Sequence, residues 1–128
     1  MTIRRFEEFE IWQKARELCK KIRLIAVTTS LSRDFGLKDQ VFDSSGTVMD
    51  NIAEGYERDG MKEFLSFLYY SKGSPGETRS QVHRIYDASH IEEEKYKELP
   101  EDCLNLSGQI KGFINYLGSS EYPGHKKK

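Results

Sequence analysis

Two histidines are the residues best suited to hold a metal ion. His83 and His90 lie seven residues apart, which places them on one side of a helix, and a neutral imidazole is a common metal ligand. A di-iron helical bundle, however, needs two Glu-x-x-His pairs, whereas this sequence contains none and comes nearest with Asp-Ala-Ser-His at 87–90. The spacing permits a two-histidine surface site, but we expect no resident metal or cofactor.

Nucleophilic catalysis has no visible basis in the sequence. It needs a hydroxyl or thiol beside a base, and no such pair can be identified along the chain. The charges in residues 1–10 replace the apolar run of a signal peptide, so we expect a cytoplasmic protein. In that compartment Cys19 and Cys103 are expected to be buried thiols rather than a disulfide. We therefore expect a protein that is not an enzyme.

Short basic clusters are candidate nucleic-acid contacts. With 20 basic and 21 acidic residues and a pI near 6.3, the chain is not covered in basic surface. Solvated helix faces are the plainer interpretation, although a symmetric ring would repeat each cluster and strengthen weak contacts. The candidates are Arg4, Arg5, Lys20, Lys21, Arg23, Lys126, Lys127 and Lys128.

Three aromatic residues are candidates for base stacking or for a subunit interface. Trp12 borders the apolar stripe of the first predicted helix, which favours a place in the core or an interface. Tyr69 and Tyr70 face away from the apolar seam of the third predicted helix. Because interfaces concentrate exposed aromatic rings, we expect these residues to contact another subunit.

Helical periodicity predicts the elements that position these residues. No segment alternates at period two, whereas apolar residues recur at intervals of three and four. The sequence predicts an all-α protein, an antiparallel up-and-down four-helix bundle. The single domain spans 1–128, with a core over about 5–117 and a mobile basic tail at 118–128. The predicted helices cover 6–26, 37–55, 59–89 and 103–117, with a loop at 28–34.

Glycine, aspartate and proline mark the expected helix ends. Gly55 suits a left-handed C-terminal cap, and Asp59 can cap the following helix. Pro75 removes an amide donor from the long third helix, so we expect a kink or short break there. Pro100 leaves two alternatives for residues 92–99, either an extra turn of the last helix or a separate short helix.

One segment carries a family resemblance. Residues 51–56, Asn-Ile-Ala-Glu-Gly-Tyr, resemble the four-helix-bundle proteins encoded in intervening sequences of bacterial 23S ribosomal RNA genes. Residues 6–16 and 35–37 look like the starts of that family's first two helices, and the similarity extends over roughly 5–117. The polar and glycine residues that match are Gln40, Asn51, Glu54, Gly55, Arg58, Gly73, Ser74, Glu77 and Gln81.

The resemblance implies a homopentameric ring of antiparallel bundles. Related bundles are accessory proteins of diversity-generating retroelements, in which a basic pentamer contacts nucleic acid and a reverse transcriptase. This chain departs from the pattern, since Phe42 and Asp43 stand at positions that are usually basic. Each lost phosphate contact would remove about one unit from the salt dependence of nucleic-acid binding.

These observations lead to a ranked set of functional expectations. The first is a noncatalytic, self-assembling scaffold for a macromolecular partner, followed by an RNA-binding accessory protein and, remotely, a metal-dependent bundle enzyme. Asn51, Glu54, Glu77 and Gln81 could form a polar ring at a pentamer axis or a ligand site. Helix caps and buried hydrogen bonds are the favoured interpretation of these four residues.

Overall fold

The computed structural model describes residues 3–119, whose regular elements are all helices without strands, so the all-α prediction is confirmed. The tail residues 120–128, including Lys126, Lys127 and Lys128, lie outside the described part. The elements are η1 Phe6–Glu8, α1 Glu10–Thr28, η2 Ser30–Arg33, α2 Phe35–Glu57, α3 Met61–Asp87 and α4 Glu93–Leu117.

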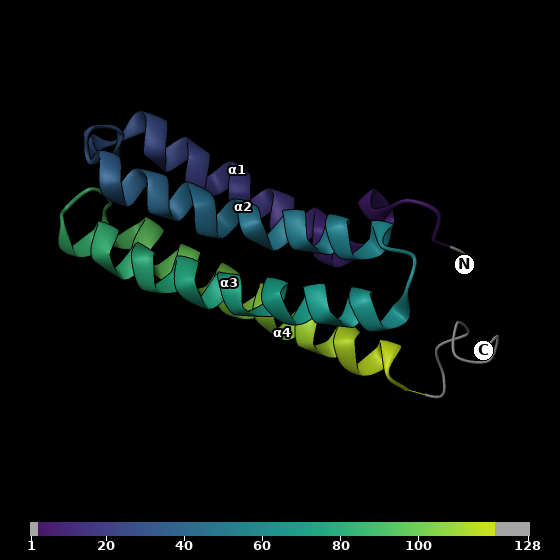
Figure 1. Ribbon diagram of the computed structural model, residues 1–128. Helices are drawn as coiled ribbons and strands as arrows, with labels where there is room; N and C mark the ends of the chain where they lie inside the picture. Colours follow the sequence, from purple (N-terminus) through teal and green to yellow (C-terminus); the bar gives the residue numbers. More distant parts are fainter. Residues whose placement is uncertain (1–2, 120–128) are drawn as a thin grey trace.

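The four helices form an up-and-down bundle. Figure 1 shows them side by side, with α1 beginning and α4 ending at the same end of the molecule. Each helix contacts the next one along the chain, and α4 closes the bundle against α1 through a less extensive contact. Short connections between consecutive helices enforce this antiparallel arrangement.

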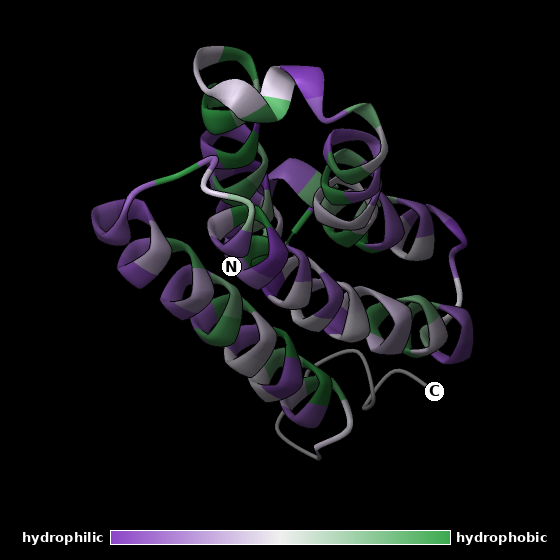
Figure 2. Cartoon of the chain, turned by 90° about the vertical axis from the view of Figure 1, so that its left-hand side faces the viewer, coloured by the Kyte–Doolittle hydropathy of each residue, from purple (hydrophilic) through white to green (hydrophobic). Residues whose placement is uncertain are grey.

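The core is built from the apolar stripe of each helix. Hydrophobic and hydrophilic patches alternate around the helices in Figure 2, as expected of amphipathic elements. The predicted stripe of α1 is buried throughout, and it consists of Ile11, Ala15, Leu18, Ile22 and Ile25. Within the described residues, no helix combines the length and apolarity needed to cross a bilayer.

Neither internal proline interrupts its helix. α3 continues through Pro75, so the short break expected there is absent, while a bend within the continuous helix stays a prediction. Buried residues lie on both sides of Pro75, among them Ser71 and Thr78, and packing against α2 keeps the two halves in one register. α4 likewise contains Pro100, so residues 93–99 are its first turns and not a separate helix.

The link between α2 and α3 corrects two expectations about caps. Gly55 is not a left-handed cap, because α2 continues to Glu57 and no described glycine has a positive φ. A Cβ at position 55 would lie only 2.6 Å from Cβ of Phe67, so the glycine permits close contact between α2 and α3. Asp59 has a φ of 63° and reverses the chain, which leaves Gly60 as the N-cap of α3.

Both cysteines are free thiols, but only Cys103 is buried as expected. Cys103 is buried in α4, and burial raises the pKa of its thiol to about 12. Cys19 is half-buried in α1, where its Sγ donates to the carbonyl oxygen of Ser45 at 3.2 Å. Burial also raises the pKa of the Cys19 thiol, so both groups remain protonated at neutral pH.

Candidate functional site

A buried polar layer joins α2 to α3. The Ser44 hydroxyl donates to the amide oxygen of Gln81 at 2.6 Å and lies 2.8 Å from the hydroxyl of Thr78. Seven residues before Thr78 on α3, the Ser71 hydroxyl donates to the carbonyl oxygen of Val48 at 2.7 Å. Such hydrogen bonds are satisfied in only one register of the two helices. Gln81 is therefore held by a buried hydrogen bond between the two helices, and Ser44 is the partner that sequence reasoning did not assign to it.

The other family-matching residues do not converge on one site. Glu54 and Arg58 form an ion pair of 2.6 Å on the exposed side of α2, and Gln40 accepts a hydrogen bond of 2.8 Å from Arg84. Glu77 lies on α3, where it accepts a long hydrogen bond of 3.5 Å from Gln81. The rest are distributed along α2 and α3: half-buried Asn51, buried Gly55, exposed Gly73 and buried Ser74.

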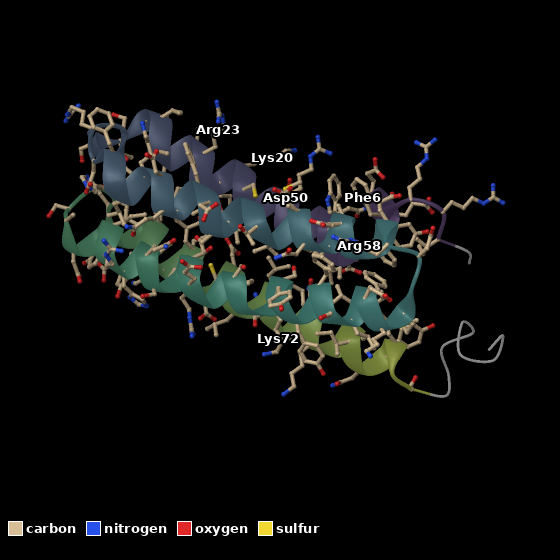
Figure 3. The ribbon with its side chains drawn as sticks, in the orientation of Figure 1. Phe6, Lys20, Arg23, Asp50, Arg58 and Lys72 are labelled. Carbon is tan, nitrogen blue, oxygen red and sulfur yellow. The ribbon has the colours of Figure 1, made fainter. Side chains whose placement is uncertain are left out.

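The outer face of α1 carries exposed basic side chains. Lys20 and Arg23 project away from the bundle in Figure 3. Lys20 makes only a loose pair with Glu17, at 3.5 Å, and both side chains are largely exposed. Arg4 and Arg5 are also exposed and precede η1. These four cations remain accessible to an anionic partner.

Lys21 differs from its basic neighbours because it points toward α4. Its Nζ lies 2.8 Å from carboxylate oxygens of both Glu98 and Asp102. Hydrogen bonds to Asp102 and then to Glu98 raise the pKa of Lys21 to about 12. The same contact lowers the pKa of Glu98. The charge of Lys21 is thus balanced within the chain, which makes it the weakest of the candidate phosphate contacts on α1.

A groove of about 310 Å³ lies between α1 and α4 beside Lys21. Its lining mixes both charge signs with amides and two leucines, so it does not match a ligand of one chemical class. The groove lies where α4 closes the bundle against α1, through a contact less extensive than those between consecutive helices. The lining residues are Lys14, Glu17, Leu18, Lys21, Asp102, Asn105, Leu106 and Gln109.

The outer face of α2 carries the opposite charge from that of α1. Asp39, Asp43, Asp50, Glu54 and Glu57 are all exposed along this helix. Asp43 is one of the residues that replace the family's usual basic pair. This acidic face of α2 repels phosphate, which confines any nucleic-acid contact to other surfaces.

Two adjacent tyrosines are exposed on α3. Tyr69 and Tyr70 are 62% and 65% exposed. The Tyr70 ring lies 6.3 Å from the ring of Phe67, over which the guanidinium of Arg58 sits at 5.1 Å. We refer to Phe67, Tyr69 and Tyr70 as the α3 aromatic patch. Trp12, by contrast, is half-buried on α1 and packs against neighbours of its own segment.

The two histidines do not form the two-residue metal site that their spacing permits. His83 Nδ1 lies 2.7 Å from the hydroxyl of Tyr96, whereas His90 follows the end of α3 and no longer shares its helical register. Both ring nitrogens of His90 are engaged, Nδ1 by Ser30 at 2.6 Å and Nε2 by Asp34 at 2.9 Å. Across residues 3–119, no three His, Cys, Asp or Glu side chains gather in a way that would hold a metal ion.

The contact of His90 with Ser30 is one that sequence reasoning missed. It places a hydroxyl beside a base, the pair that could not be identified along the chain. Ser30 and His90 are 60 positions apart in the sequence, and they meet because the α1–α2 and α3–α4 connections lie at the same end of the bundle. No local pattern signals such a contact.

Comparison with known proteins identifies the family but no activity. A crystal structure of a protein of unknown function from the S23 ribosomal protein family of Bacteroides thetaiotaomicron has the same fold, with a TM-score of 0.74. The two chains are 18% identical, and the match covers 82% of this chain and 95% of that one. No curated protein matches the sequence. The model of the 23S rRNA-intervening sequence protein family matches residues 7–112, and the chain therefore belongs to that family.

Proposed function

We propose that this chain is a cytoplasmic, self-assembling bundle that presents a closed ring, most simply a pentamer, to a macromolecular partner. The observation that carries the proposal is the α3 aromatic patch, in which two adjacent tyrosines are more than half exposed. Burying such rings against another copy removes a large apolar area from water. A closed ring of subunits forms when one face of each subunit binds a different face of the next.

The opposite charges of α1 and α2 support the same proposal. The exposed cations of α1 and the acidic face of α2 belong to one chain, so neighbouring copies can bring complementary charges together. Charge complementarity mainly fixes orientation and excludes wrong pairings, while the aromatic patch supplies buried area.

Light scattering after gel filtration tests the assembly. At micromolar concentration the protein should have a mass that is a multiple of 14.9 kDa. Replacing Tyr69 and Tyr70 together by serine should shift it to the monomer mass. Phe35→Ser is the matched control, because Phe35 is an equally exposed ring on α2. A wild-type monomer, or a double variant that assembles normally, would refute the proposed interface.

A second candidate function is RNA binding by an accessory protein of ribosomal RNA or a retroelement. The exposed cations of α1 favour it, since Lys20 and Arg23 are repeated in every copy of a ring.

Retardation of a structured RNA should weaken steeply with salt. Replacing Lys20 and Arg23 by glutamine should reduce the slope of log K against log salt by about 0.9 per lost phosphate contact. Lys62→Gln, an exposed lysine on α3, is the control. Absence of retardation at low salt excludes this function.

A further inference from the structure

The end of the bundle that carries the α1–α2 and α3–α4 connections holds a serine, a histidine and an aspartate in one hydrogen-bonded chain. The Ser30 hydroxyl oxygen lies 2.6 Å from Nδ1 of His90. On the other side of the ring, Nε2 lies 2.9 Å from Oδ2 of Asp34. The order hydroxyl, imidazole, carboxylate is that of an activated nucleophile, its base and the group that orients the base.

Charge determines the direction in which these hydrogen bonds run. The bond from His90 lowers the pKa of Asp34, so Asp34 is a carboxylate at neutral pH and can only accept. Nε2 of His90 must therefore carry the hydrogen. In the neutral ring Nδ1 then has a free lone pair, which accepts the hydrogen of the Ser30 hydroxyl. This is the polarity in which an imidazole removes the proton of an attacking hydroxyl.

The imidazole of His90 is held in place beside a residue that is only half-buried. The His90 side chain is only 12% exposed, and the His90 amide donates to the carbonyl of Ile85 at 3.1 Å. The preceding Ser89 has a φ of 64°, a left-handed conformation that costs a residue with a Cβ some energy. Ser30 is half-buried at the start of η2 and reaches solvent. A fixed base within hydrogen-bond distance of a hydroxyl, on a residue that is not fully buried, is the arrangement that nucleophilic attack requires.

Exposed apolar side chains lie where α1 ends and α2 begins, on either side of this connection. Val27 stands three positions before Ser30 and Phe35 directly follows Asp34, and both are more than half exposed. Lone exposed apolar residues are ordinary, but here two of them flank the hydrogen-bonded chain in sequence. An aryl ester combines an apolar ring with a reactive carbonyl group, and this determines the substrate class that we test.

We propose that Ser30 is a nucleophile, activated by His90, that hydrolyses activated aryl esters of carboxylic acids. Ser30 Oγ attacks the ester carbonyl carbon as its proton passes to Nδ1 of His90. The bond to the aryl oxygen breaks, and the proton leaves with the phenol. Water then hydrolyses the acyl-Ser30 ester by the same proton path, so that ester and water give acid and phenol. Asp34 acts through His90 as a positioning residue. This activity is separate from ring assembly.

Covalent labelling with a fluorophosphonate, followed by peptide mass spectrometry, tests the nucleophile on the full chain. Ser30 should be labelled at least tenfold faster than any other serine. Hydrolysis of p-nitrophenyl acetate should be lost in Ser30→Ala and should fall by about a hundredfold in His90→Gln, the usual contribution of a general base. Ser32→Ala is the matched control, since Ser32 lies in the same short turn and should leave both readouts unchanged.

A second variant separates chemistry from folding. Asp34→Asn should lower the esterase rate and shift the midpoint of its pH profile, while circular dichroism shows an intact helical fold. Labelling of Ser30 no faster than that of Ser32, or full labelling in a folded His90→Gln variant, overturns the proposal and leaves the three residues as a clasp between two connections. Light scattering of the same samples reports assembly independently, so failure of one proposal is distinguishable from failure of the other.

Discussion

The two ends of the bundle are held together by different kinds of interaction. At the aromatic end, where α1 begins and α4 ends, the rings of Phe9, Tyr56, Phe64 and Phe113 meet at centroid distances from 5.1 to 6.0 Å. At the polar end, Ser30, Asp34 and His90 are joined by two hydrogen bonds. Ring packing is nearly independent of pH, whereas the polar contacts depend on protonation. The apolar core runs along the whole bundle, so the two ends differ in how their contacts respond to pH rather than in whether they are packed.

The aromatic end is organised around Phe9. This residue lies just before α1, and its ring contacts Tyr56, Phe64 and Phe113, which come from the other three helices. The Tyr56 hydroxyl donates to the carbonyl of Ile3 at 3.0 Å, which brings the segment before η1 into the same cluster. The Phe9 side chain thus links all four helices at this end. Removing a ring from this cluster is expected to lower the unfolding free energy of the whole bundle.

The largest effect is expected from Phe64→Ala at the aromatic end. Phe64 is buried against three other rings, so its removal leaves a cavity and should cost about 3–5 kcal/mol of unfolding free energy. Urea denaturation followed by circular dichroism measures this loss. Tyr69→Ala, an exposed ring on the same helix, should cost less than about 0.5 kcal/mol in the monomer. Equal losses in the two variants would contradict the assignment of the core.

The next largest effect is expected at Gly55, beside the aromatic end. A Cβ there would clash with Cβ of Phe67, so Gly55→Ala should destabilise the protein by about 1–3 kcal/mol. Gly46→Ala on the same helix is the matched control, because a Cβ at 46 meets nothing within 4 Å. That control should stabilise the helix by up to about 1 kcal/mol. Thermal melts of the pair distinguish close packing from helix propensity.

Acid should weaken the polar end before the aromatic end. The hydrogen bond from His90 lowers the pKa of Asp34, so folding favours the carboxylate form. That contribution is present above about pH 4, the ordinary aspartate value, and is lost as the pH falls through the lower folded pKa. Melting temperatures measured from pH 6 to pH 2 should therefore depend less on pH in Asp34→Asn than in the wild type. Asp39→Asn, an exposed aspartate on α2, should reproduce the wild-type curve.

The smallest effect is expected at Lys21, between the two ends. Its partners Glu98 and Asp102 are partly exposed, so Lys21→Gln should cost less than about 1 kcal/mol and should matter less at high salt. Since the pKa of Lys21 is raised to about 12, its contribution is complete below about pH 10 and disappears as the pH rises through 12. Lys20→Gln, which changes the neighbouring exposed lysine and keeps Lys21, should show the same alkaline loss as the wild type. A large loss of unfolding free energy at neutral pH in Lys21→Gln would contradict the predicted order of effects.

Local patterns predicted the helices well and their ends poorly. The apolar positions of α1 were identified because a helix repeats every 3.6 residues, and burial follows from that repeat alone. The short break expected at Pro75 is absent, because the cost of one lost hydrogen bond is visible in the sequence, whereas the packing of α3 against α2 that offsets it is not. Gly55 was marked as special, but for a cap rather than for its contact with Phe67.

The sequence by itself determined the helical class, the up-and-down arrangement and the family of this protein, because periodicity, short connections and a contiguous motif are local properties. Tertiary structure alone decided which polar residues act together. Gln81 gained its partner Ser44 from another helix, and Ser30 gained His90 from a connection 60 positions away. The physical reason is that hydrogen bonds depend on distances of about 3 Å, which only the packed bundle fixes between residues so far apart in the chain.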